Sequence, residues 1–144
     1  RKLGRDGGST MATVIEELKA HASSMVSAGG DLEVIGRQLL DSAAQHTAST
    51  EMILQMAGDE PEAAKSAAFD YMMQTGYLFG AWQMAVGASV AQAQLDAGSD
   101  NSFYARKIAT TRFYAESILP RCNGHAGAVA NAAGALQDFP VDWL

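Results

Sequence analysis

Apolar residues recur at helical spacing along most of the chain, and nowhere do apolar and polar residues alternate as they do in a half-buried strand. The most continuous segment runs from Glu62 to Leu95, and no charged residue interrupts it between Tyr71 and Leu95. One face of this segment is apolar and includes Leu78/Phe79, Trp82, Ala85/Val86 and Ser89/Val90. A second face carries small residues at intervals of four and seven positions: Gly76, Gly80, Gly87 and Ala91. Small residues let a neighbouring helix approach closely, so we predict a central helix with two packing faces.

Two amphipathic segments precede this central helix. In the first, Ser9 or Thr10 is the expected cap and Gly29-Gly30 the expected end. Asp31 is the expected cap of the second, which would run for about 26 residues, or roughly 40 Å, to Gly58. Such a length indicates a bundle of long helices.

The next boundaries are marked by proline and by acidic residues. Asp59 and Glu62 have capping-box spacing, with Pro61 in the first turn, and they would start the central helix. Gly98 would end it, and Ser99 or Asp100 would cap a fourth helix. Pro120 removes a backbone donor and crowds the carbonyl of the residue four positions earlier, which predicts a kink in that helix.

Phe139–Leu144 is too short and too proline-marked for a helix, although its aromatic side chains suit docking on the end of a bundle. Three tight glycine-centred connections make neighbouring helices antiparallel. We therefore predict an all-α fold, an antiparallel up-down-up-down four-helix bundle. Residues 1–8 would be a linker or the end of a preceding element, and residues 9–144 one helical domain.

Charge and cysteine content narrow the functional classes. The net charge is −6 and the ten Lys and Arg residues are scattered, which argues against nucleic-acid binding. The uncharged run is about as long as a membrane span, but it contains Gln74, Gln83, Gln92 and Gln94 and lacks flanking basic clusters, so a bundle helix is the better interpretation. A single cysteine, no signal-peptide pattern and no initial Met predict a cytoplasmic protein and a piece of a longer one.

Metal and haem motifs are incomplete. A di-metal bundle site needs Glu-x-x-His, whereas Glu17 and His21 are four residues apart and His46 and Glu51 are five apart. Covalent haem attachment needs Cys-x-x-Cys-His, and in Cys122-Asn123-Gly124-His125 the position of the second thiol is occupied by the histidine itself. Cys122 is better interpreted as a buried structural thiol.

The remaining polar and aromatic candidates have structural interpretations as well. His21 and His46 lie on or beside apolar stripes, and we expect satisfied core histidines, with Thr47, Thr50 or a tyrosine as partner of His46. A nucleophilic pair of Cys122 with a histidine lacks a third, orienting residue. The aromatic residues at helical spacing are expected in the core or in an interface. We predict no catalytic, cofactor-binding or metal-binding residue in this chain.

Two stretches resemble one protein family. Arg1–Gly8 resembles the segment that closes the catalytic portion in one branch of the acyl-CoA dehydrogenases. Phe103–Arg121 resembles the tyrosine-lysine, arginine-phenylalanine-tyrosine and leucine-proline pattern of that branch's C-terminal extension. The resemblance is to the 3-methylmercaptopropionyl-CoA dehydrogenase-like branch, extends from Arg1 to about Leu136, and includes Gly80-Ala81-Trp82 in the central helix.

This resemblance implies a parent enzyme that uses FAD to oxidise an acyl-CoA thioester to the 2,3-enoyl-CoA and passes electrons to an electron-transferring flavoprotein. The family's catalytic glutamate and most FAD and CoA contacts lie upstream of the matched segment. The resemblance thus implies a scaffolding or assembly domain whose partners are the catalytic portion of the same polypeptide and, in a dimer or tetramer, further copies. The alternative is a free-standing helical interaction module without activity, which the coding sequence upstream would distinguish.

Overall fold

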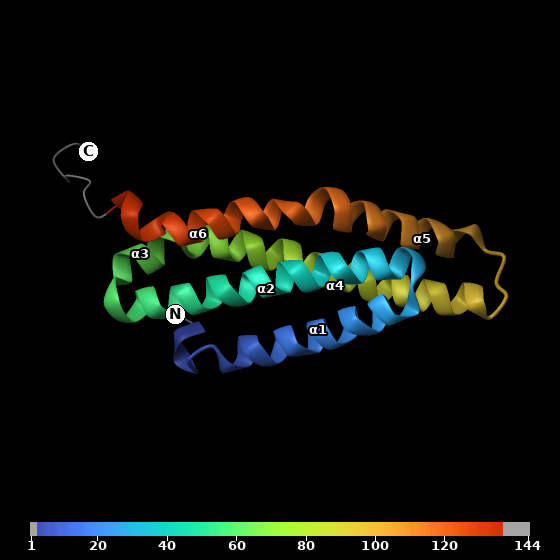
Figure 1. Ribbon diagram of the computed structural model, residues 1–144, viewed down its shortest axis with the longest axis horizontal. Coiled ribbons are helices and arrows are strands. Elements are labelled where there is room, and N and C mark those ends of the chain that lie inside the picture. Colours follow the sequence, from blue (N-terminus) through green and yellow to red (C-terminus); the bar gives the residue numbers. More distant parts are fainter. Residues whose placement is uncertain (1–2, 137–144) are drawn as a thin grey trace.

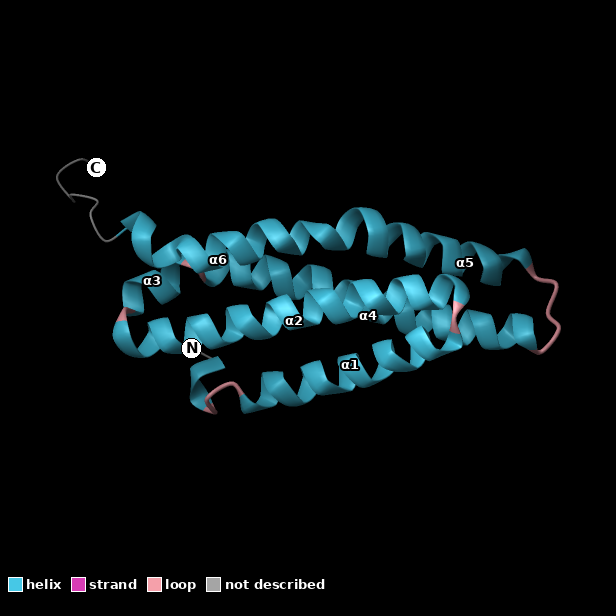
Figure 2. Ribbon diagram, viewed as in Figure 1, coloured by secondary structure: helices cyan, strands magenta, loops and turns pink. Residues whose placement is uncertain are grey.

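The chain is described, over residues 3–136, by a computed structural model, and every element of secondary structure within these residues is a helix (Figures 1 and 2). The long helices are α1 (Ser9–Ala28), α2 (Gly30–Asp59) and α4 (Ala68–Asp96). A fourth long segment consists of α5 (Ser102–Phe113), η2 (Tyr114–Ile118), η3 (Leu119–Arg121) and α6 (Cys122–Leu136). Two short helices, η1 (Leu3–Arg5) and α3 (Pro61–Ser66), complete the described part. The predicted all-α class is confirmed, whereas the predicted tail Phe139–Leu144 lies outside the described residues.

The long segments run in alternating directions along a common axis (Figure 1). Two of them, α2 and α4, form the centre: α2 packs against α1, α4 and α6, and α4 also packs against α5. By contrast, α1 packs mainly on α2. The central position predicted for the third helix is therefore shared with α2, because α2 buries residues on two sides.

A continuous core lies between these helices. Its largest fully buried apolar side chains are Leu18, Met25, Ile35, Leu39, Leu78, Leu119 and Val129. Many smaller positions of the core on α4 are alanines, among them Ala81, Ala85 and Ala88. Alanine brings neighbouring helices close together and adds little side-chain entropy cost.

The predicted caps of α1 and α2 are wrong. Gly8, at φ +84°, precedes the first residue of α1, and the Asp6 carboxylate accepts hydrogen bonds from the Gly8 and Thr10 backbone amides, both at 3.1 Å. Asp31 lies in the first turn of α2, after Gly29 and Gly30, whose φ values are +80° and +60°. Because glycine reaches positive φ without strain, Gly29-Gly30 turns the chain between α1 and α2, as predicted.

The central helix begins differently from the prediction. α2 continues through Gly58 to Asp59, and Glu60 precedes α3 without a side-chain cap, so Asp59 and Glu62 form no capping box. Pro61 occupies the first turn, as predicted. A single turn residue, Ala67, separates α3 from α4.

At the other end of α4, Gly98 adopts φ +89° just beyond the helix, as expected for a C-terminal glycine. The cap of α5 is Asn101, not Ser99 or Asp100, because the Asn101 side chain accepts a hydrogen bond from the Phe103 amide at 3.0 Å.

Around Pro120 the fourth segment changes its winding without breaking. Tyr114–Ile118 forms a π-helix and Leu119–Arg121 a 3-10 helix, after which α6 continues. A proline lacks the donor for the carbonyl four residues earlier, so a local change of hydrogen-bond spacing is the expected accommodation. The buried side of the segment resumes beyond it, with Cys122 and Val129 both 0% exposed.

The glycine face of α4 is only partly what its spacing predicts. A Cβ at Gly80 would lie 3.1 Å from the Tyr114 hydroxyl, and one at Gly87 would lie 2.9 Å from Lys107 Cε, so α5 and η2 do approach this face. Gly76, in contrast, faces open space. The closest helix approach lies elsewhere, at Gly36 of α2, where a Cβ would lie 2.6 Å from the Ala22 carbonyl oxygen of α1.

Candidate functional site

A cavity of about 600 Å³ lies beside η1 and between α1 and α4. We call it the η1 groove. Apolar side chains supply most of its walls, with Met11 and Val14 from α1 and Tyr71 and Phe79 from α4. Arg5 and Asp6 lie at its edge, and the Asp6 carboxylate is already bound to the start of α1. The groove suits an apolar side chain of a protein partner better than it suits a reacting substrate.

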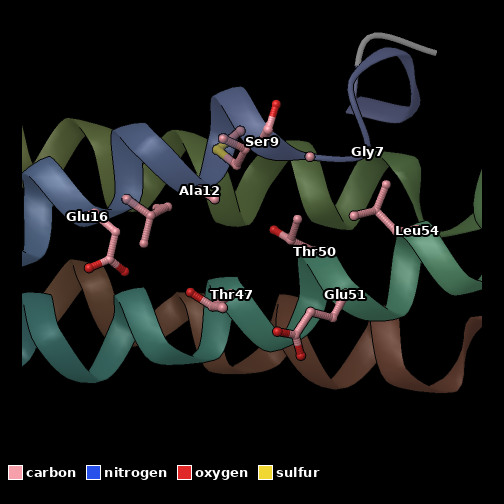
Figure 3. A pocket seen from close by; sticks show the side chains of 11 residues that line it. Gly7, Ser9, Ala12, Glu16, Thr47, Thr50, Glu51 and Leu54 are labelled. Carbon is pink, nitrogen blue, oxygen red and sulfur yellow. The ribbon is translucent and has the colours of Figure 1, made fainter.

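A smaller cavity of about 250 Å³ lies between the start of α1 and α2 (Figure 3). Its ionisable residues are Glu16 of α1 and Glu51 of α2, and Glu16 is paired with Lys19 at 2.9 Å. The hydroxyls of Thr47 and Thr50 donate to carbonyls of their own helix. The lining therefore contains no nucleophile with a neighbouring base and no cation for an anionic ligand.

Four polar residues form a hydrogen-bonded cluster that links α2 to α4: His46 and Thr50 of α2, and Tyr71 and Thr75 of α4. The Thr75 hydroxyl donates to the Tyr71 carbonyl at 2.8 Å, so the hydrogen bond between His46 Nε2 and Thr75 Oγ1, also 2.8 Å, has His46 as donor. By the same reasoning, Thr50 donates to the His46 carbonyl, and the Tyr71 hydroxyl donates to Thr50 at 2.8 Å. The predicted partner of the His46 ring, Thr47, Thr50 or a tyrosine, is therefore wrong, because the ring bonds to Thr75 and Thr50 reaches only the His46 backbone carbonyl.

Burial sets the ionisation of this cluster. His46 is 0% exposed, and desolvation lowers its pKa from 6.5 to about 4, so the ring is neutral near pH 7. Desolvation likewise raises the pKa of Tyr71. Since no described residue bonds to Nδ1 of His46, the cluster is a neutral hydrogen-bonded element of the core rather than an acid–base pair.

The other histidines and the cysteine are separated from this cluster. His21 Nε2 contacts the Ser89 hydroxyl at 3.1 Å and joins α1 to α4. His125 Nδ1 contacts Asp70 at 2.8 Å, and its ring stacks on Tyr77. Desolvation raises the pKa of the fully buried Cys122 thiol to about 11, which keeps it protonated and unreactive as a nucleophile.

Two negative findings concern the described part of the chain. Residues 3–136 contain no group of three or more His, Cys, Asp or Glu side chains arranged to hold a metal ion. No helix in the same range is long and apolar enough to cross a bilayer.

The residues that carry the family resemblance serve packing. In the first stretch, Asp6 caps α1, and Gly8 packs so closely that a Cβ there would lie 2.8 Å from Leu54 Cδ1. In the second, Arg112 bonds to Asp31 of α2 at 2.6 Å. The Tyr114 hydroxyl donates to the Tyr77 carbonyl of α4 at 3.4 Å.

An exposed apolar face on α4 is the feature that the sequence reasoning missed. Phe69, Met72, Val86 and Val90 are 61%, 59%, 40% and 58% exposed. Val86 and Val90 belong to the face predicted to be buried, and only their neighbours, Ala85 and in part Ser89, are covered. With Gly76 and Gln83 between them, these residues form what we call the α4 outer face.

Comparison with known proteins places this chain among related sequences. Residues 10–140 match the family described as acetyl-CoA dehydrogenase C-terminal like. The chain belongs to this family. It is 29% identical over 136 residues to 3-methylmercaptopropionyl-CoA dehydrogenase of Ruegeria pomeroyi, a match that covers 94% of the chain and 23% of that enzyme.

A second relative is the broad-specificity linear acyl-CoA dehydrogenase FadE5 of Mycobacterium tuberculosis. It is 28% identical over 128 residues, which cover 83% of the chain and 21% of that enzyme. The chain thus spans less than a quarter of the length of either relative. The predicted resemblance to a C-terminal domain of acyl-CoA dehydrogenases is confirmed.

Proposed function

We propose that this chain is the C-terminal helical domain of a larger FAD-dependent acyl-CoA dehydrogenase, and that its own role is to support the fold and assembly of that enzyme. The parent would oxidise an acyl-CoA thioester to the 2,3-enoyl-CoA and pass electrons to an electron-transferring flavoprotein. The observation that carries the proposal is the family match over residues 10–140, together with the matches that cover 23% and 21% of two acyl-CoA dehydrogenases.

The geometry supports a structural role for this part. Its buried ionisable groups are held in forms without reactivity, a neutral His46 and a protonated Cys122. The η1 groove and α1 offer an apolar docking surface at the edge of the bundle where α1 is packed mainly on one neighbour. In this proposal the catalytic portion packs on α1 and residues 1–8.

The start of α1 does not fit the phosphates of FAD. A dinucleotide pyrophosphate is commonly bound by free amides at a helix N-terminus that follows a glycine-rich turn. At α1, which does follow Gly7-Gly8, the Asp6 carboxylate already bonds to these amides and would repel a phosphate. In this proposal the catalytic base and the FAD contacts belong to another portion of the parent.

A free-standing interaction module remains the second candidate, favoured by the α4 outer face, whose exposed apolar residues need no catalytic portion to act as a binding surface. The two candidates differ in their coding sequence. The first requires a dehydrogenase of about 400 residues or more upstream of Arg1, and the second a nearby start codon.

The isolated chain is expected to fold, to stay colourless after incubation with FAD, and not to reduce an electron acceptor when given acyl-CoA. The physical reason is that, within residues 3–136, the buried His46 and Cys122 are held in unreactive forms and the amides at the start of α1 already bind Asp6. Absorbance near 450 nm after gel filtration, together with a dye-reduction assay, measures both properties. Recovery of the chain with stoichiometric FAD would refute the division of roles proposed above.

A further inference from the structure

The segment Ser102–Arg121 differs in charge from the rest of the chain. It holds four of the ten Lys and Arg residues but only one of the sixteen Asp and Glu residues, so its net charge is +3 while the rest of the chain sums to −9. Two phenylalanines of the same segment, Phe103 and Phe113, are 54% and 61% exposed. Neither the packing of the bundle nor the function proposed above uses these exposed groups.

The exposed groups share one side of α5. Phe103, Arg106, Thr110 and Phe113 are all exposed and follow the three- and four-residue spacing that places residues on one face of a helix. We call these four residues the α5 stripe. Lys107 extends the stripe at one edge, where its side chain lies against Gly87 of α4.

The cations of this segment differ in their ion pairs. Arg112 is bound to Asp31 at 2.6 Å and to Glu116 at 3.1 Å. Within residues 3–136, Arg106 and Lys107 form no ion pair, whereas one cation of each of α1, α2 and α3 pairs with a glutamate of its own helix. The α5 stripe therefore presents an unpaired guanidinium between two exposed aromatic rings.

We propose that the α5 stripe binds an acidic protein segment in which carboxylates lie beside apolar side chains. The carboxylates bond to Arg106 and Lys107, and the apolar side chains cover Phe103 and Phe113. A guanidinium binds a carboxylate through two parallel hydrogen bonds, which fixes its orientation as well as its charge. Arginine and aromatic residues are also the side chains that contribute most to the stability of protein interfaces.

The surrounding charge argues for a partner of limited size. Asp96 and Asp100 lie just before α5, and the chain outside Ser102–Arg121 is strongly acidic. An extended polyanion, such as a nucleic acid or an anionic membrane, would meet repulsion beyond the stripe. From Phe103 to Phe113 the helix rises about 15 Å, which a short protein segment can span. The stripe lies on the outside of a helix, and neither cavity described above includes its residues, so it does not enclose a small anion.

The stripe lies apart from the surface that we propose for the catalytic portion. Figure 1 shows α1 and α5 on opposite sides of α2, which packs against both. Docking of a catalytic portion on α1 would leave the α5 stripe open. The inference therefore does not depend on dehydrogenase activity in the parent.

Binding of a synthetic peptide to the 144-residue chain tests this proposal. The probe is a fluorescent helical peptide of about 15 residues with glutamate and leucine on one face. Two control peptides carry lysine in place of glutamate or serine in place of leucine. By fluorescence anisotropy we expect a Kd of about 10–100 µM for the probe and at least about tenfold weaker binding of both controls. A lysine peptide that binds as tightly as the probe would overturn the proposal.

Substitutions in the chain locate the site. Arg106→Glu and Phe113→Ser should each weaken binding of the probe at least about fivefold, because one reverses the charge and the other removes an apolar anchor. The matched control is Lys65→Glu, which makes the same change of charge at an exposed position of α3 and should leave the Kd within about twofold. Circular dichroism confirms that each variant is folded. If Lys65→Glu weakens binding as much as Arg106→Glu does, the net charge and not the stripe attracts the probe, and the proposal is wrong.

The other possible occupants are tested on the same residues. Amide resonances of the ¹⁵N-labelled chain are followed during addition of the probe, of double-stranded DNA, or of vesicles made from equal parts of phosphatidylcholine and phosphatidylglycerol. We expect the probe to shift resonances of residues 102–121, and we expect neither DNA nor vesicles to do so at physiological salt. Tighter binding of DNA or vesicles at these residues would contradict a protein partner and assign the stripe to that occupant instead.

Discussion

Gly36→Ala is expected to lower the free energy of unfolding by about 2 kcal/mol. The added Cβ would lie 2.6 Å from the Ala22 carbonyl oxygen and 2.9 Å from Val26 Cγ2, so α1 and α2 have to move apart. Overpacking of this kind costs about 1–3 kcal/mol or more, and the better helix propensity of alanine returns only about 1 kcal/mol. Because α1 depends mainly on α2 for its packing, moving the two helices apart loses contacts that no other described helix replaces. Chemical denaturation followed by circular dichroism measures the change.

The matched control for this prediction is Gly127→Ala in α6. A Cβ there meets no atom within 4 Å, so only the propensity gain remains, and stability should rise by about 0.5–1 kcal/mol. The two variants are thus predicted to have opposite signs. If Gly36→Ala also stabilises the protein, the close approach of α1 to α2 is contradicted.

Acidification from pH 6.5 to pH 4 is expected to remove about 3 kcal/mol of stability through His46 alone. Its pKa is about 4 in the folded protein and near 6.5 when the chain is unfolded. Between these values the unfolded state binds the proton and the folded state does not, so stability falls as the pH is lowered through this window. A difference of about 2.5 units corresponds to about 3 kcal/mol. Below about pH 4 both states are protonated and this contribution no longer changes.

Other groups also titrate in this window, so the effect of His46 is measured as a difference. His46→Gln keeps a donor for the Thr75 hydroxyl but carries no proton-binding ring nitrogen. Its stability at neutral pH will be lower, yet its loss of stability between pH 6.5 and pH 4 should be smaller than that of the unsubstituted chain. Parallel pH profiles for the two proteins would show that His46 is not held neutral by burial. His21, whose pKa is also lowered by desolvation, contributes to both profiles equally.

Helical periodicity predicted the long helices because it depends only on which residues are apolar. Leu18, Ala22 and Met25 are buried as that pattern requires. The caps were predicted poorly, since a cap depends on the conformation of the residues before the helix. Asp6 reaches the start of α1 only because Gly7 and Gly8 adopt positive φ, which spacing alone does not reveal.

Two packing features are not predicted from the sequence: the close helix approach at Gly36 and the exposed α4 outer face. The reasons are related. Gly36 lies beside Ile35 in an otherwise ordinary stripe, and only the partner helix shows that its missing side chain is needed. Its one sequence signal is a glycine at the edge of a buried stripe in the middle of a helix. On α4 the absence of charge makes both sides of the helix look buried, so the sequence does not distinguish the covered Ala85 from the exposed Val86.

The sequence predicts no catalytic residue, and this stays a prediction. The candidates that spacing suggested are divided among three structural roles. His46 belongs to a buried neutral cluster, His125 pairs with Asp70, and Cys122 donates to the Gln74 carbonyl at 3.6 Å. The family itself was predicted from stretches whose residues serve capping and packing, which explains why a resemblance was visible although no chemistry was.

Deleting residues 9–144 from the longer polypeptide that we propose tests most directly whether this domain supports structure rather than chemistry. Native mass, thermal stability and turnover per bound flavin would be measured on the truncated and intact enzymes. We expect assembly or stability to fall, while turnover per bound flavin in the surviving fraction stays within about threefold. A truncated enzyme that is stable, normally assembled and fully loaded with FAD, yet has lost its turnover, would contradict a purely structural role.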